Sequence, residues 1–521
     1  MGWLIVAPFE SALDYQRETS YERNTLSGGP LDWSNQPQVF KRYRSGREVV
    51  LPVPEDWPRS SLAEVAILTG AKGTLGASEA AGRLTLPVLS RVLGLAYGIT
   101  AEANHGGEPF YYRSVPSAGA LYPCELYLAA QAVEGLVPGL YHYQVGRHRL
   151  TELRPRARYG AIGGLITAPP EPEPGLAIFI TTLFFRGAWK YRKRCYRYLL
   201  LDSGHLLENL DLALKLMGLA PVPALDFDDL GVNRLLGLDP EREAALAAVW
   251  LAGKEAAPEA AAATAPAIER LQPVEPEACR CAPRDQSYPE IEAIHRLSSR
   301  VAVAAQPDPE LLDELGLEVA VWTALEDDEA IPVEPPRALA DLIRSRRSRR
   351  NFVPKALAPD GWRALLLDLC RPGWYQPVGA CAPDQAVCVG LIAERLTGLD
   401  PGFYLLDRSR CRIGLVRHGR FLEAMAQVSL DQAWLAQAAC HLLFLTRLDR
   451  TEAVRGPRSY RHALIEAGRL AQRLYLTAEQ CGLGACGIGA FFDREAAALL
   501  RFPDATAMTY LLALGPVKKR L

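Results

Sequence analysis

YRYLLLDSGHLLENLDLALKLMGL at residues 196–219 and YRHALIEAGRLAQRLYLTAEQCGL at residues 460–483 are two versions of one sequence. They align without a gap at a constant offset of 264 residues, since 196 pairs with 460 and 219 pairs with 483. A second pair, GLVPGLYHY at 135–143 and GLDPGFYLL at 398–406, agrees nearly as well at an offset of 263. The chain is therefore expected to carry the same fold twice.

Each long copy has the pattern of a helix that is buried over most of its surface. Apolar residues recur at intervals of three and four over 196–217 and over 460–481, and Gly218 and Gly482 provide stop signals. A helix that is apolar around much of its circumference needs neighbours on several sides. We expect the two helices to pack against each other at the centre of the molecule.

Strand-like and helical patterns alternate within each repeat, which indicates an α+β fold in two tandem domains. At 521 residues the chain is also too long for one ordinary core. We expect an N-terminal arm (1–60), a first domain (61–253), a linker with a connecting helix (254–334) and a second domain (335–521). The linker begins with a run rich in Ala, Pro and Glu, which is typical of a semi-flexible connector.

Composition excludes several classes of function. A net charge of −2 does not suit a protein whose main partner is nucleic acid, because phosphate binding needs a basic excess. The longest apolar stretch, near 174–185, falls short of the roughly 20 residues that span a bilayer. The N-terminus lacks the basic start of a secretory signal, and the 11 cysteines show neither zinc spacing nor a disulfide framework. We expect a cytoplasmic protein with no metal site and no membrane or nucleic-acid partner.

The two copies differ where binding residues are concentrated. The basic run RSRRSRRNF at 344–352 occurs only in the second copy, and the small-residue loop RSVPSAGALYP at 113–123 is intact only in the first. The second copy has QPVGACAP at 376–383 in place of that loop. If one site needs both elements, the chain can build a single composite site, and that site lies between the halves.

The basic run suits a phosphate. Arginines two positions apart with a hydroxyl between them can converge on one phosphate, because guanidinium groups match its oxygens in pairs. A solvated basic helix end is an equal alternative from spacing alone. In the loop, Pro116, Ser117 and Gly119 are small enough for a flat ligand to approach, although a tight turn before a strand has the same composition.

Three further segments are candidates for the same site. Lys190 and Tyr191 lie in FFRGAWKYRKRCYRYLLLDSGH (184–205) and could transfer protons if their surroundings lower both pKa values; the alternative is a salt-bridged structural segment. The glycines of GLGACGIGAFFD (482–493) could bring backbone N–H groups to a planar ring. The basic C-terminus KKRL is either a disordered tail or a second set of phosphate contacts.

At these residues the chain resembles the flavin-dependent nitroreductase superfamily, and most closely its SagB-type or ThcOx-like dehydrogenases. The arm adds to the resemblance with LDWSNQPQVFKRY at 31–43. The resemblance implies an intramolecular pseudo-dimer of two nitroreductase-like domains with one FMN per chain between them. It implies that FMN contacts come from Arg346, Ser348, Arg350, Arg113, Pro116, Ser117, Gly119, Gly487, Gly489, Ala490, Lys519 and Arg520, and that Lys190 and Tyr191 act on the substrate proton.

Three functions remain open from the sequence. The first is an FMN-dependent oxidoreductase that moves hydride between flavin N5 and a small heterocyclic or peptide-derived substrate. The second is an NAD(P)H-dependent reductase of nitro or quinone compounds on the same fold. The third is a flavin-free scaffold within a biosynthetic complex. The protein is expected to be a pseudo-dimeric monomer or a homodimer.

Overall fold

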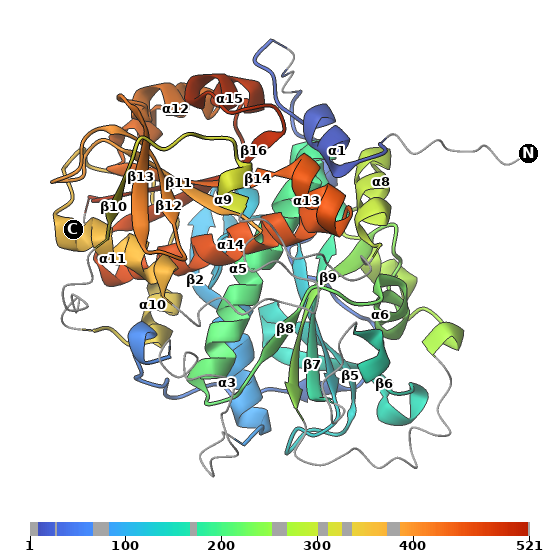
Figure 1. Cartoon of the computed structure of the whole chain (residues 1–521). Helices are drawn as coiled ribbons and strands as arrows, with labels where there is room; N and C mark the ends of the chain where they lie inside the picture. The colour runs from blue at the N-terminus through green and yellow to red at the C-terminus, as the bar shows by residue number, and fades with distance from the viewer. Residues whose placement is uncertain are drawn as a thin grey trace, which may run out of the picture.

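The computed structural model describes residues 9–24, 26, 29–65, 83–166, 174–252, 268–300, 311–325, 336–371 and 386–518. Two α+β halves lie side by side, and each is built on an antiparallel sheet of seven strands (Figure 1). The expected class, two tandem domains that form an intramolecular pseudo-dimer, is confirmed.

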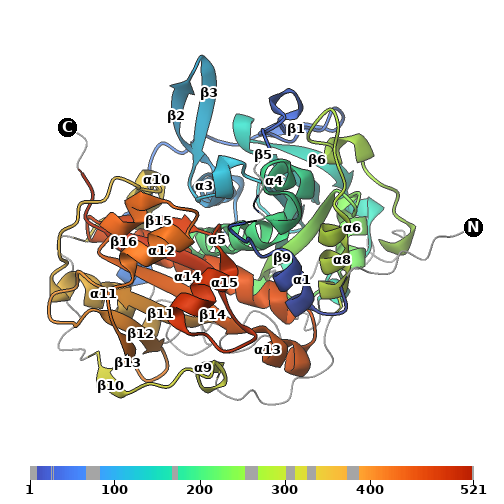
Figure 2. The same cartoon turned by 90° about the horizontal axis from the view of Figure 1, so that it is seen from above.

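The sheet of the first half has the strand order β1-β6-β5-β4-β7-β9-β8. Its strands are β1 (Glu48–Val50), β4 (Cys124–Ala130), β5 (Gly139–Gln144), β6 (Arg149–Pro155), β7 (Pro174–Leu183), β8 (Val222–Ala224) and β9 (Glu243–Ala252). Its helices are α1 (Ala12–Glu18), α3 (Leu86–Tyr97), α4 (Phe184–Tyr191), α5 (Cys195–Leu216) and α6 (Asp229–Leu236). A separate hairpin of β2 (Ile99–His105) and β3 (Glu108–Arg113) projects from this half (Figure 2).

The second half repeats this order as β10-β13-β12-β11-β14-β16-β15. Its strands are β10 (Val321–Ala324), β11 (Cys388–Ala393), β12 (Gly402–Asp407), β13 (Arg412–His418), β14 (Cys440–Arg447), β15 (Gly484–Ile488) and β16 (Thr506–Gly515). Its helices are α8 (Pro289–Ser298), α9 (Leu311–Glu314), α10 (Leu339–Ser345), α11 (Pro359–Cys370), α12 (Leu422–Val428), α13 (Leu448–Arg455), α14 (Ser459–Gln480) and α15 (Asp493–Leu500). The arm and the linker thus each supply an edge strand, β1 and β10, to a sheet.

The long helices α5 and α14 cross between the two sheets, as the sequence predicts (Figure 1). They touch backbone to backbone at Gly204 and Gly468, which are equivalent at the repeat offset of 264. A Cβ on Gly204 would stand 2.9 Å from the Cα of Gly468, and a Cβ on Gly468 would stand 3.0 Å from the Cα of Gly204. Each would also overlap a carbonyl oxygen of the opposite helix. Glycine at both positions lets the helices meet.

Two equivalent ion-pair clusters hold the starts of these helices. Nη1 of Arg194 and Nη1 of Arg197 contact the two carboxylate oxygens of Asp493 at 2.6 and 2.7 Å. At the repeat offset, Arg458 and Arg461 contact Asp229 in the same way. The arginines of the first half therefore bind Asp493, the first residue of α15 in the second half, and those of the second half bind Asp229, the first residue of α6 in the first half.

The duplication extends to the helices that precede each domain. The Thr19 hydroxyl after α1 accepts from Arg197, and the Ser298 hydroxyl at the end of α8 accepts from Arg461 at 2.9 Å. Backbone carbonyls of Gln16 and His295 accept from the same two arginines. The two helices contact each other and lie side by side in Figure 2. They are one element in two copies, although one falls in the expected arm and the other in the expected linker.

The described residues contain neither a bilayer-spanning helix nor a cluster of metal-ligating side chains. None of their helices is long and apolar enough to cross a bilayer. None of their His, Cys, Asp and Glu residues form a group of three or more that could hold a metal ion.

Replacing Gly468 by alanine tests the helix crossing. We expect Gly468→Ala to lower the free energy of unfolding by about 3 kcal/mol or more, because the new Cβ overlaps the backbone of α5 and neither helix can retreat from a packed core. Thermal or denaturant unfolding measures the change. Gly361→Ala in α11 is the matched control: nothing lies within 4 Å of its Cβ, so a gain of about 0.5–1 kcal/mol is expected. Equal effects from both variants would contradict the crossing.

Candidate functional site

The structure brings the small-residue loop of the first half onto Lys190 and Tyr191. These two residues end α4, and a Cβ built on Gly119 would lie 2.8 Å from the Tyr191 hydroxyl and 3.3 Å from Lys190 Nζ. Gly119 has a positive φ of +63°. Two non-glycine residues of the same loop, Ala120 and Tyr122, also have positive φ values, +54° and +48°. Left-handed backbone at non-glycine residues is unfavourable and occurs at functional sites. The loop must therefore be held by contacts outside itself.

Asp202 of α5 supplies those contacts, a role that no sequence pattern indicates. Its carboxylate accepts from the Ser117 hydroxyl at 2.5 Å and from the Ala118 amide at 3.2 Å. The Ser117 oxygen in turn accepts from the Tyr122 amide at 2.9 Å. Burial raises the pKa of Asp202 to about 7, against the lowering effect of these two hydrogen bonds.

Arg346 crosses the interface to the same loop. It is 3% exposed, and its guanidinium donates to the carbonyls of Ser114 at 2.8 Å and Arg113 at 3.0 Å. Its Nη1 is buried without a hydrogen-bond partner among the described residues. Burial lowers the pKa of Arg346. The Arg113 side chain turns into its own half, against the rings of Tyr97 and Tyr122. Arg346 therefore connects the second half to the loop through Nε and Nη2, and its Nη1 remains available to donate a hydrogen bond.

Ser348 and Gly487 meet at a tyrosine that the sequence reading did not single out. The Ser348 hydroxyl lies 3.0 Å from the Tyr475 hydroxyl, and the Gly487 amide donates to the same oxygen at 2.7 Å. The Gly487 amide is thus already bonded within the protein, so its expected contact with a flavin remains a prediction. Tyr510 packs against Gly487 and lies 3.2 Å from His205.

The rest of the glycine segment meets the first half beside Tyr191. A Cβ on Gly489 would lie 2.5 Å from the Tyr198 ring, and the Gly489 carbonyl accepts from Arg194 at 3.0 Å. The ring of Tyr198 is 4.6 Å from that of Tyr191, edge to face. Only the ring of Tyr198 therefore separates Gly489, which precedes Ala490 in the chain, from the ring of Tyr191.

Arg350 is a second cation, and its charge acts on Lys190. Arg350 is exposed, and its guanidinium lies 5.7 Å from the centre of the Trp434 ring. Burial and then the charge of Arg350 lower the pKa of Lys190. Neither cation has an ion-pair partner in the described part of the chain. Two like charges held together without a carboxylate suit an anionic ligand. Lys519 and Arg520 lie outside the described residues, which end at Lys518.

The pKa of Tyr191 differs from the expectation. Burial raises it, the charge of Asp202 raises it further, and the charge of Arg350 only partly opposes them. The idea that both members of the pair have lowered pKa values is wrong for Tyr191, because burial disfavours the phenolate. At neutral pH Tyr191 is a hydrogen-bond donor.

A cleft of about 1070 Å³ opens beside the pair. Trp189, Lys190 and Tyr191 form part of its wall, and the arm supplies Tyr21 and Leu31. The cleft is larger than most pockets for single small molecules, which run to about 1,000 Å³.

Family comparison gives the two halves one origin. The model of the nitroreductase family matches residues 81–254 and 408–516, more than half of the chain. The chain belongs to the nitroreductase family. A crystal structure of a nitroreductase-like protein from Anabaena variabilis ATCC 29413 superposes with a TM-score of 0.73 at 25% identity, over 98% of this chain and all of that one.

Two curated relatives match this chain in sequence. The trifolitoxin-processing protein TfxB of Rhizobium leguminosarum bv. trifolii is 32% identical over 32% of this chain, and the match spans 46% of TfxB, about half its length. The nitroreductase-like protein MJ1384 of Methanocaldococcus jannaschii is 30% identical over 29% of this chain and 74% of its own length. The expected superfamily is therefore confirmed.

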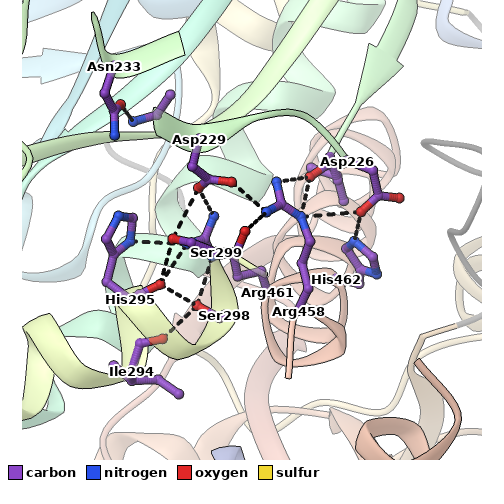
Figure 3. Close-up of polar contacts among 12 residues, drawn as sticks. Asp226, Asp229, Asn233, Ile294, His295, Ser298, Ser299, Arg458, Arg461 and His462 are labelled. Carbon is purple, nitrogen blue, oxygen red and sulfur yellow. Dashed lines mark hydrogen bonds and ion pairs between the residues drawn. The ribbon is translucent and has the colours of Figure 1, made fainter. Parts of the chain in front are cut away.

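The equivalent place at the other end of the pseudo-dimer is closed by charge (Figure 3). At the repeat offset, His462 stands for Tyr198 and Asp226 stands for Ala490. His462 contacts Asp226 at 3.0 Å, and Arg458 contacts it at 3.2 Å. All three side chains are buried. The nitroreductase halves therefore have different side chains at their two equivalent interface sites.

The residues equivalent to the Lys190–Tyr191 pair are also different. They are Val454 and Arg455, which carry neither a lysine nor a phenol. Arg458 still donates to the Leu225 carbonyl at 2.9 Å, as Arg194 does to Gly489. The framework of the interface is thus kept at both ends, while the candidate site residues occur at one. The loop at 376–383 lies outside the described residues.

Asp493 links this framework to the site and can be tested. We expect Asp493→Asn to lower the free energy of unfolding by about 3–5 kcal/mol, because it leaves the buried guanidiniums of Arg194 and Arg197 without a counter-charge. Although burial opposes it, Arg194 and Arg197 hold the pKa of Asp493 below its ordinary 3.8. The contribution is therefore present at neutral pH and is lost as the pH falls below about 4.

Unfolding measured from pH 3 to pH 8 checks this expectation. Asp431→Asn is the control, because Asp431 forms an ion pair with Arg23 on the surface and its side chain is 62% exposed. A surface pair of this kind contributes about 0–1 kcal/mol. Loss of the same size in both variants, or a deficit that does not shrink in acid, would argue against the buried cluster.

Proposed function

We propose that this protein is an FMN-dependent oxidoreductase that binds one FMN per chain between its halves. The observation that carries the proposal is the pair of uncompensated cations, Arg350 and Lys190, beside the small-residue loop at one end of the interface. The equivalent place at the other end is filled by Asp226, His462 and Arg458. One chain would therefore hold one cofactor.

The residues at this end fit the group. Ser348 and Arg350 are exposed, and Nη1 of buried Arg346 has no described partner, so all three can donate to a phosphate. The exposed Lys518 leads into Lys519 and Arg520, for which we propose further phosphate contacts. Gly119 adjoins Tyr191, the Tyr191 ring packs against that of Tyr198, and Tyr198 adjoins Gly489. We propose that Pro116, Ser117 and Gly119 cover one face of the flavin ring.

FMN would supply hydride transfer at its N5. Lys190 and Tyr191 of the chain itself would accept and position the substrate proton. Burial and Arg350 bring the pKa of Lys190 down, which makes its amine a better proton acceptor near neutral pH, whereas Tyr191 keeps its proton and can orient the substrate by donating a hydrogen bond. Nearby Arg192 has a φ of +49°, which fixes the chain direction directly after the pair.

We propose a peptide-derived or heterocyclic substrate, as in SagB-type dehydrogenases. The similarity to TfxB, which processes trifolitoxin, supports this class, and so does the size of the cleft beside Lys190. A second candidate is an NAD(P)H-dependent nitro or quinone reductase, which the similarity to MJ1384 favours. Anaerobic reduction by NAD(P)H followed by turnover of a nitroarene would select it. A cytoplasmic location and a pseudo-dimeric monomer or homodimer remain part of the proposal.

Flavin content tests the cofactor and its number. Purified protein is expected to contain or take up one FMN per chain, measured by absorbance after release. Arg350→Gln should reduce FMN affinity by about 10-fold to 100-fold, since a charge-assisted hydrogen bond is worth about 1.5–3 kcal/mol. Arg420→Gln is the control, because Arg420 is 75% exposed and 3.8 Å from Glu394 on the surface. A colourless protein that takes up no FMN would leave the flavin-free scaffold as the answer.

Lys190→Ala separates chemistry from cofactor binding. The variant should keep most of its FMN, because Arg346, Ser348 and Arg350 are proposed to bind the phosphate directly and Lys190 adds only its charge to the site, and it should lose turnover by about 10²–10⁴-fold, the usual contribution of a positioned acid or base. Lys193→Ala on the same segment is the control, since its ammonium pairs with Glu18 on the surface. Loss of flavin from Lys190→Ala, or unchanged turnover, would refute the catalytic role.

A further inference from the structure

Asp202 is a buried acid with no counter-charge, at a position where the other repeat has one. It is 6% exposed, and no cation contacts it within the described residues. Its equivalent at the repeat offset is Glu466 of α14, whose carboxylate forms an ion pair with Arg408 at 2.9 Å and accepts from the Ala386 amide. Both acids accept from a backbone amide, but only Glu466 is neutralised by an arginine.

A buried carboxylate without a counter-charge is costly, so its oxygens need hydrogen-bond donors from the surrounding protein. Both hydrogen bonds of Asp202 go to the loop, one to Ser117 and one to the Ala118 amide. The next residues, Gly119 to Tyr122, include two left-handed non-glycine residues that are unfavourable by themselves. Gly119 is also the point at which the loop touches Lys190 and Tyr191.

We propose that Asp202 is a positioning residue that holds the 117–122 loop in its strained conformation against Lys190 and Tyr191. It acts through Ser117 and the Ala118 amide and does not itself contact the reacting atoms. The proposal builds on the proposed oxidoreductase function, because the loop it holds is the proposed cover of the flavin ring. Without this anchor, the loop would relax away from the pair and the distance between the loop and Lys190 would no longer be fixed.

The titratable side chains around Asp202 are neutral at pH 7. The described titratable side chains that feel the charge of Asp202 include Cys124 of β4, Cys195 at the start of α5, Tyr191 of α4 and Tyr510 of β16. Burial raises the pKa of each of these four, so all are neutral at pH 7. None of them can supply or remove a charge when the loop moves.

Two variants at one position separate the anchor from simple packing. In Asp202→Asn, the amide oxygen can accept from the Ala118 amide and the amide nitrogen can donate to Ser117, so the loop should stay in place. In Asp202→Leu, both hydrogen bonds are lost. Hydrogen–deuterium exchange of the peptide that covers 117–122 should then be about tenfold faster or more than in the wild type, and unchanged in Asp202→Asn.

Turnover gives the second reading. In Asp202→Leu we expect kcat to fall about 100-fold with KM changed much less, because misplaced groups lose transition-state contacts. Asp202→Asn should recover most of the loss. Glu466→Gln is the matched control: it changes the equivalent acid of the other repeat and lowers the free energy of unfolding by leaving Arg408 without its counter-charge, but under native conditions it should leave both local exchange at 117–122 and kcat unchanged. If Asp202→Leu does not fold, Ser117→Ala removes one of the two hydrogen bonds and should give a smaller change in the same direction.

The outcomes are decisive in either direction. Exchange at 117–122 that stays at the wild-type rate in Asp202→Leu overturns the proposal, and so does a loss of kcat in Asp202→Asn as large as in Asp202→Leu. A wild-type protein that binds no FMN overturns the proposed function instead, and the exchange measurement still decides the role of Asp202.

Discussion

The close crossing of α5 and α14 at Gly204 and Gly468 determines where everything else can lie. Side chains cannot intervene at that point, so the two halves are fixed at backbone contact distance. Further along, Glu208 of α5 receives Arg469 and Arg473 of α14, whose charges keep its pKa low at about 2 although burial opposes this. With the helices fixed in this way, the start of α5 faces the glycine segment of the second half, and the loop at Ser117 faces Arg346.

The charges at the interface divide into two kinds. Paired charges, as in the clusters around Asp493 and Asp229, are compensated by carboxylates and hold helix starts in place. The exposed cations Lys190 and Arg350 have no carboxylate among the described residues, and they lie at one end only. Electrostatics therefore distinguishes the framework from the candidate site. The cations of the framework are paired with carboxylates, and those of the candidate site are not.

The sequence predicted the parts of the molecule that depend on local pattern. The two long helices and the connecting helix of the linker follow from periodicity and stop signals. The repeat offset even identifies the glycine pair. Asp202 and Tyr475 could not be found this way, because their importance comes from contacts to residues about 85 and 127 positions away. The equivalence of α1 and α8 could not be seen in the sequence for a related reason. Their sequences differ, and only the arginines that donate hydrogen bonds to them, Arg197 and Arg461, are recognisably alike.

One difference between the two ends follows from energetics alone. Removing one partner from a buried ion cluster leaves a buried charge and costs about 3–5 kcal/mol, so the Arg–Arg–Asp clusters cannot be lost at either end without destabilising the pseudo-dimer. Exposed cations and a surface loop carry no such cost, and they can be lost from the end where no ligand depends on them. The burial of Asp226, His462 and Arg458 then makes the loss permanent, since reopening that end would require three buried polar side chains to lose their partners together. A duplicated fold with two equivalent interfaces in this way keeps the candidate site residues at one interface only.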